Sequence, residues 1–193
     1  MSAAPSAPNP AKPVEINAPE VPQWQTHYLA TSIRDSLSSV QYPPKVKRYI
    51  QTFLTKMEIS IEEYRLGRNL LQGVAKHRTT NDYFFVPLRA QWHFEKSAAA
   101  LYQAAQLTRP IIRKKQLFEP NDKSSPLYKL NKIYDRSKHC EKVQRDFRIP
   151  ATRVWLTAEG LENPECTLKF VEMHGLIVSL INVAKFVSDK SQE

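Results

Sequence analysis

Glycine is scarce in this chain, with only four among 193 residues. It is the usual residue of tight hairpin turns and of the loops that wrap around phosphate groups. The sequence also contains no G-x-G-x-x-G, Walker or G-x-S-x-G motif, which argues against a nucleotide-binding loop and a nucleophile elbow. Plentiful Ala, Leu, Gln, Lys and Glu favour helices instead.

Cysteine is equally rare, and Cys140 and Cys166 are too few for a disulfide framework. The cysteines and the isolated histidines also lack the spacing of metal ligands, so we expect no metal and no cofactor. Long apolar runs are missing as well. The longest, residues 175–184, is about half a membrane span. With no secretory signal at the N-terminus, these features predict a cytoplasmic protein without a membrane-spanning segment.

Residues 1–22 are rich in Ala, Pro and Ser and include six prolines. Such a segment buries too little apolar surface to offset the entropy of ordering it. We therefore expect a disordered tail over 1–22, one domain over 23–188 and a short C-terminal tail over 189–193. A short first helix, anchored by Trp24, is predicted at the start of the domain.

Four long amphipathic helices are predicted after it. The clearest covers 44–75, in which apolar residues recur every three or four positions: Val46, Ile50, Phe53, Met57, Ile61 and Tyr64. The second covers 82–107 and the third 126–145. The last is predicted from an Asn163 cap, with Pro164 at its first position, to about Ser188.

Core positions in the later helices are assigned from the same spacing. The second helix is expected to bury Leu88, Trp92, Ala98, Ala99, Leu101, Tyr102 and Ala105, and the third Leu127, Leu130, Ile133 and Tyr134. Trp155 is also assigned to the core, within an extended stretch over 153–157 that could form a short edge strand. With no other strand pattern, the predicted fold is all-α: an antiparallel bundle of about four long helices plus the short N-terminal one.

Positive charge is concentrated in one part of the chain. Residues 109–153 hold 13 of the 28 Lys and Arg residues and only five acidic residues, whereas the remaining residues hold 15 basic and 14 acidic groups. A local basic field of this kind favours an anionic partner, and phosphate is the commonest one.

Within the third helix, Lys129, Lys132, Arg136 and His139 follow a spacing of i, i+3, i+7 and i+10, on a face away from Leu130 and Ile133. Such a stripe suits a phosphate backbone. A solvated helix face and a site for an acidic protein are the alternatives. The candidate nucleic-acid-binding residues are Arg113, Lys114, Lys115, Lys129, Lys132, Arg136, Lys138, His139, Lys142 and Arg145.

The stretches Leu130-Asn131…Tyr134…Ser137-Lys138-His139, Phe84-Phe85…Trp92-His93-Phe94-Glu95 and Val154-Trp155-Leu156-Thr157 resemble the HEPN superfamily of nucleotide-binding and ribonuclease helical bundles. The resemblance implies a bundle and a homodimer. Ribonucleases of that superfamily carry Arg, four to six residues and then His. This chain departs from the pattern, because two residues separate Arg136 from His139. These two are the only catalytic candidates that the resemblance offers.

The predicted function is therefore a non-catalytic module that binds RNA or another polyanion through residues 109–153. One alternative is a divergent, metal-independent HEPN-type endoribonuclease in a defence or toxin system, which would use Arg136 and His139. Another is a structural subunit of a larger complex.

Overall fold

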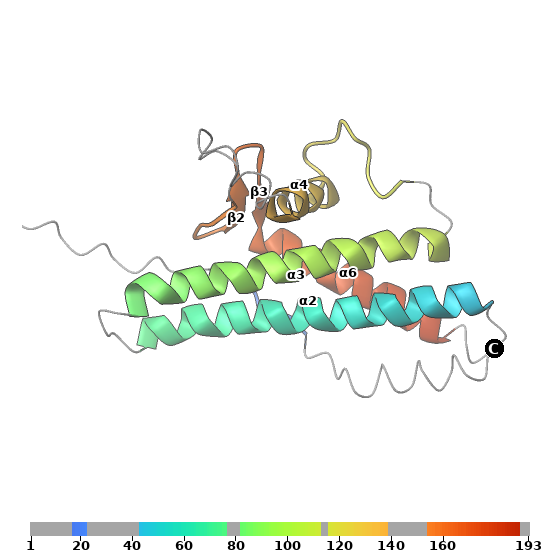
Figure 1. Cartoon of the computed structure of the whole chain (residues 1–193), viewed down its shortest axis with the longest axis horizontal. Coiled ribbons are helices and arrows are strands. Elements are labelled where there is room, and N and C mark those ends of the chain that lie inside the picture. Colours follow the sequence, from blue (N-terminus) through green and yellow to red (C-terminus); the bar gives the residue numbers. More distant parts are fainter. Residues whose placement is uncertain (1–16, 23–42, 77–81, 113–115, 139–153, 190–193) are drawn as a thin grey trace, which may run out of the picture.

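The computed structural model describes residues 17–22, 43–76, 82–112, 116–138 and 154–189. Two long antiparallel helices lie side by side, a third helix lies behind them, and a short helix and a small sheet pack against one side (Figure 1). The described elements are α2 (Pro44–Lys76), α3 (Asp82–Ile112), α4 (Pro126–Lys138), β1 (Trp155–Leu156), β2 (Gly160–Asn163), β3 (Cys166–Lys169) and α6 (Phe170–Asp189). The predicted first helix lies outside the described residues.

Helix α2 confirms the clearest sequence pattern. It begins at Pro44, as predicted, and ends at Lys76, one residue beyond the expected limit. Ile50, Phe53, Met57 and Tyr64 are almost fully buried. Proline is well tolerated in the first turn of a helix, where its missing N–H has no intrahelical partner anyway, so Pro44 sets the start of α2.

Helix α3 is longer than predicted, and its buried face is partly as predicted. It extends to Ile112, with Pro110 inside its last turn. Leu88 and Trp92 were expected in the core, but they are 53% and 55% exposed. The predicted core positions Ala98, Leu101 and Ala105 are buried, together with Ala90, Phe94 and Ala104.

Three aromatic rings join α2, α3 and α6 at the centre of the core. The ring of Tyr64 contacts those of Phe94 and Phe170 edge-on, with centroids 5.4 and 6.4 Å away, and the Phe94 and Phe170 centroids are 4.6 Å apart. Rings in such edge-on and tilted arrangements contribute packing energy beyond the area they bury. This cluster therefore ties the last helix to the α2–α3 pair.

Small residues let α2 and α3 approach closely. Ser60 and Ser97 exchange hydrogen bonds in the interior: each hydroxyl donates to the other residue's carbonyl oxygen, at 3.1 and 2.7 Å. At Gly67, an added Cβ would lie 3.1 Å from the Phe94 ring. The close approach explains why α3 packs mainly alanines against α2.

The predicted, mostly helical fold is confirmed, and a small antiparallel sheet is added to it. Its order is β1-β2-β3, with Trp155 opposite Glu162 and Gly160 opposite Lys169. The extended stretch predicted around Trp155 is β1, but it pairs with a hairpin that the sequence did not indicate. The chain is thus mostly helical, with a three-stranded sheet beside α4.

Asn163 corrects the predicted start of the last helix. Its side-chain oxygen accepts hydrogen bonds from the N–H groups of Glu165 and Cys166, at 2.8 and 2.9 Å, within the turn between β2 and β3. A helix N-cap makes the same type of bond, so the same residue serves either structure. Helix α6 starts later, at Phe170, where the Glu172 carboxylate accepts from the Lys169 N–H at 2.9 Å.

Residues 17–22, at the end of the predicted tail, pack against the helices. Val21 is only 2% exposed and belongs to the core. Arg68 on α2 donates to the Ala18 carbonyl at 3.0 Å and lies 3.8 Å from the Glu20 carboxylate. The expectation that residues 1–22 have little to bury therefore does not hold for residues 17–22.

Candidate nucleic-acid interface

Helix α4 presents the predicted basic stripe. It begins at Pro126, the predicted start, where proline fits the first turn of a helix. Upstream, the Asp122 carboxylate accepts from the Ser124 N–H and hydroxyl, and the hydroxyl bond lowers the pKa of that carboxyl. Leu130 and Ile133 are fully buried, and so fix which face of α4 meets the core.

The stripe does not face open solvent. Lys129 Nζ lies 2.5 Å from Glu172 Oε1 in the first turn of α6, and both side chains are 19% exposed. Because the other oxygen of Glu172 accepts from the Lys169 N–H, this carboxylate joins α4 to the start of α6. Lys129 is thus a bridging residue between two helices.

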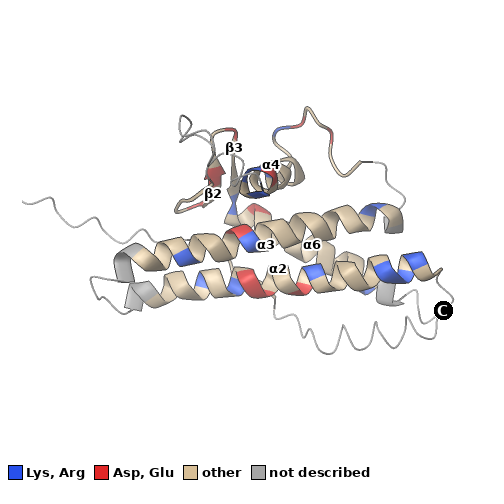
Figure 2. Ribbon diagram, viewed as in Figure 1, with Lys and Arg blue, Asp and Glu red and all other residues tan. Residues whose placement is uncertain are grey.

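The next two cations of the stripe share one carboxylate. Lys132 Nζ lies 2.9 Å from Glu165 Oε2, and Arg136 Nη2 donates to Glu165 Oε1. Hydrogen bonds from Lys132 and Arg136 hold the pKa of Glu165 below its usual range, and Glu165 in turn raises the pKa of Lys132. Figure 2 shows this arrangement as basic residues on α4 with acidic residues on the neighbouring hairpin.

These contacts add carboxylate partners that the sequence pattern of the helix did not indicate. The helical spacing of Lys129, Lys132 and Arg136 is as predicted, but carboxylates from the hairpin and α6 partly neutralise all three. Lys138 is exposed, with its ammonium 5.9 Å from the centre of the Tyr134 ring. The other candidates lie outside the described residues: Arg113, Lys114, Lys115, His139, Lys142 and Arg145.

A second polar group, missed by the sequence analysis, lies where α4 meets α3. Gln91 Nε2 donates to Glu95 Oε1 at 2.8 Å and to the Val154 carbonyl at 2.7 Å, and the Ser137 hydroxyl donates to Glu95 Oε2 at 3.3 Å. Burial raises the pKa of Glu95, and the Gln91 and Ser137 bonds oppose that rise. The spacing of Gln91 and Glu95, one turn apart, was its only sequence signal.

These bonds also fix two distant points of the chain to one place. Ser137 precedes residues 139–153 and Val154 follows them, and both bond to side chains one turn apart on α3. The basic helix end and the return of the chain into β1 therefore lie beside the same part of α3.

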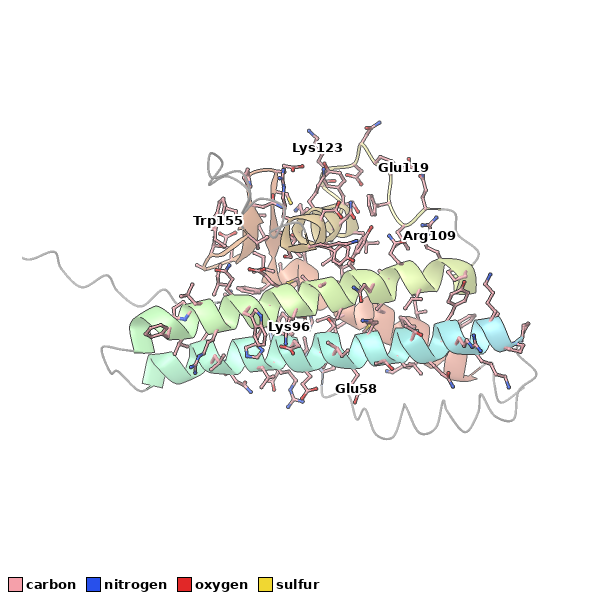
Figure 3. The ribbon with its side chains drawn as sticks, viewed as in Figure 1. Glu58, Lys96, Arg109, Glu119, Lys123 and Trp155 are labelled. Atoms are coloured by element: carbon pink, nitrogen blue, oxygen red, sulfur yellow. The ribbon has the colours of Figure 1, made fainter. Side chains whose placement is uncertain are left out.

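Another polar group bridges α2 and α3. His93 Nδ1 and Glu63 Oε2 are 2.5 Å apart, and both side chains are mostly enclosed. Lys96 approaches the other oxygen of Glu63 at 3.4 Å and lies 3.6 Å from the centre of the Trp92 ring. Figure 3 shows Lys96 over the seam between the two helices, and Trp155, 39% exposed rather than buried as expected, on the outer side of the sheet.

The described residues hold no group of three or more His, Cys, Asp or Glu side chains arranged to bind a metal ion. Cys166 packs against α4, with its Sγ 3.8 Å from the Lys129 carbonyl oxygen, and burial raises the pKa of its thiol. Among the described helices, none combines the length and apolar character that a membrane span requires.

Comparison with family models, with curated proteins and with solved structures gives no match to this chain. The resemblance to the HEPN superfamily therefore stays a prediction.

Proposed function

We propose that the protein is a binding module for RNA or another polyanion, which it binds through the basic residues of the segment 109–153. The observation that carries the proposal is the charge distribution. Thirteen basic and five acidic residues fall in this stretch, while the remaining residues are nearly balanced. Neutralising phosphates with clustered Lys and Arg releases counterions, and this release dominates binding to nucleic acids.

The positions of the described basic residues support this proposal. Lys138 is exposed at the end of α4, and Lys123 is exposed at the outer tip of the connection before α4 (Figure 3). The bond from Ser137 to Glu95 and the bond from Gln91 to Val154 place Ser137 and Val154 beside the same part of α3. Lys138, which directly follows Ser137, therefore lies near the point where the chain returns into β1.

The endoribonuclease alternative gains no observation of its own from the described residues. Arg136, which would stabilise transition-state charge, is paired with Glu165. Its proposed partner, His139, lies outside the described residues.

The test is binding of a fluorescent 20-nucleotide oligouridine, followed by anisotropy across a range of KCl concentrations. For three to five phosphate contacts, the slope of log K against log[salt] should be roughly −2 to −4. We expect replacement of Arg113, Lys114 and Lys115 by Glu to weaken binding at least about tenfold at low salt, because it reverses three positive charges of the basic segment.

The matched control replaces Lys56, Arg65 and Arg89 by Glu, and the change in net charge is the same. These residues lie in the interior of α2 and near the start of α3, whereas Arg113 directly follows the end of α3. We expect this variant to keep its affinity within about threefold, since it lies outside the basic segment. Equal weakening in both variants, or no binding by the wild type at low salt, would contradict the proposal.

A further inference from the structure

Glu165 occupies a position where two cations converge. Its two carboxylate oxygens each contact a different residue of α4, Lys132 on one side and Arg136 on the other. The three side chains are between 30% and 34% exposed. An anion held between a lysine and an arginine in this way has the same acceptor chemistry as a phosphate oxygen pair.

The backbone places this carboxylate independently of the ion pairs. Glu165 is in the two-residue turn between Asn163 and Cys166, which are directly paired across the hairpin. The Asn163 side chain accepts from the N–H of Glu165 itself, and the Cys166 thiol contacts the Lys129 carbonyl on α4. The hairpin therefore carries Glu165 to α4 as a fixed feature of the fold.

The exchange of this carboxylate for another anion is energetically accessible. Ion pairs that remain partly exposed contribute only about 0 to 1 kcal/mol, because water and salt screen them. A polyanion that brings several phosphates gains counterion release at each cation it reaches. A phosphate can thus replace Glu165 with little loss to the fold.

We propose that Lys132 and Arg136 form a phosphate site for the bound polyanion, and that Glu165 occupies this site as an internal competitor that keeps affinity low. This inference rests on the proposed function, because it concerns the same ligand. Lys129 differs from Lys132 and Arg136. Its partner Glu172 also accepts from the Lys169 N–H at the start of α6, so a phosphate that displaced Glu172 from Lys129 would compete with a carboxylate anchored by a second bond.

The experiment compares Glu165→Gln with the wild type in the same oligouridine assay. The matched control is Glu162→Gln, which removes an equal charge from the neighbouring strand β2 at a side chain that is also half-buried. We expect Glu165→Gln to bind roughly five- to twentyfold more tightly at low salt. Its salt slope should steepen by about 1.4, the value for two further contacts to a single strand. Glu162→Gln should change affinity less than about twofold.

A third variant adds Lys132→Gln and Arg136→Gln to Glu165→Gln, and should lose the gain in affinity. Melting curves of all variants report whether the hairpin still packs on α4. Equal gains for Glu165→Gln and Glu162→Gln, or a gain that survives loss of Lys132 and Arg136, would overturn the inference while leaving RNA binding intact. Absence of binding in every variant would overturn the proposed function itself.

Discussion

Glu95 is a carboxylate in surroundings that disfavour its charge. Burial raises its pKa above the usual value, and the bonds from Gln91 and Ser137 only partly offset this. Between the unfolded pKa of about 4.3 and the raised folded pKa, the folded state binds more protons than the unfolded one. Stability therefore falls as pH rises through this window, and stays lower above it.

We expect Glu95→Gln to be more stable than the wild type at pH 7. Glutamine keeps an oxygen that accepts from Gln91, and its amide can donate to the Ser137 hydroxyl, while the buried charge is lost. The difference in melting temperature should shrink below about pH 4, where the wild-type carboxyl is protonated. The measurement is thermal unfolding, followed by circular dichroism over a pH range from about 3 to 8.

The control for this substitution is Glu58→Gln, at an exposed carboxylate on α2 (Figure 3). It should change stability by less than about 0.5 kcal/mol at every pH. Loss of stability in Glu95→Gln at pH 7 would show instead that the negative charge itself holds α4 and β1 to α3.

Single side chains also show where the sequence was informative. The α2 core positions were predictable, because the buried apolar residues from Ile50 to Tyr64 recur every three or four positions. On α3, the exposed Leu88 and Trp92 have the same i, i+4 spacing as the buried Ala90 and Phe94. Side-chain size alone favoured Leu88 and Trp92 as core residues. Small residues on both helices allow α2 and α3 to lie close together, and this short distance between the helices favours smaller side chains at their contact. The distance between two helices cannot be read from the sequence pattern of either one.

At the scale of elements, the β2–β3 hairpin depends on a glycine. A Cβ at Gly160 would lie 2.1 Å from the Leu168 carbonyl oxygen and 2.8 Å from the Lys169 Cα, both in the backbone of the paired strand. We expect Gly160→Ala to destabilise the protein by roughly 2 kcal/mol or more, because the two strands must separate to admit the methyl group. Urea unfolding at equilibrium measures this change.

Gly175→Ala is the control for that substitution. Gly175 is exposed in α6, and nothing lies within 4 Å of its added Cβ. Alanine is favoured over glycine in a helix, so this variant should be more stable by about 0.5 to 1 kcal/mol. Effects of opposite sign, with the larger one at Gly160, would fit the structure, whereas a neutral Gly160→Ala would contradict the close strand contact.

There is a physical reason why the sequence did not predict the β2–β3 hairpin. Asn163-Pro164 is a sound helix-start signal, and the turn uses the same side-chain oxygen in the same way. The basic stripe has a related explanation. Its spacing was predicted correctly from α4 alone, but Glu165 and Glu172 come from elements that follow much later in the chain. A local sequence pattern predicts which residues share a face of a helix. The residues that pack against that face are known only from the tertiary fold.

At the scale of the whole molecule, residues 17–22 pack against the helices although they belong to none of them. We expect removal of residues 1–22 to lower the melting temperature more than removal of residues 1–16. The longer deletion loses the buried Val21 side chain and the Arg68 bond to Ala18, a loss of about 1 to 3 kcal/mol. Differential scanning calorimetry of the two truncated chains checks this.

Matching melting temperatures for the two truncated chains would mean that the Val21 contact contributes nothing. A Val21→Ser variant of the full chain separates the buried side chain from the loss of backbone. It should reproduce only the part of the longer deletion's effect that comes from burying Val21, because Arg68 keeps its carbonyl partner.

The ring cluster of Tyr64, Phe94 and Phe170 also sets an order of assembly. Helices α2 and α3 are neighbours in the chain, so their contacts close a short loop and form early. Phe170 comes about eighty residues after Phe94 by its position in the sequence, and the ribosome makes it later. Until it arrives, the paired helices display two large rings with no third ring to cover them. During synthesis the nascent chain thus passes through a partly folded state that exposes apolar surface and is prone to aggregation, until α6 packs against α2 and α3.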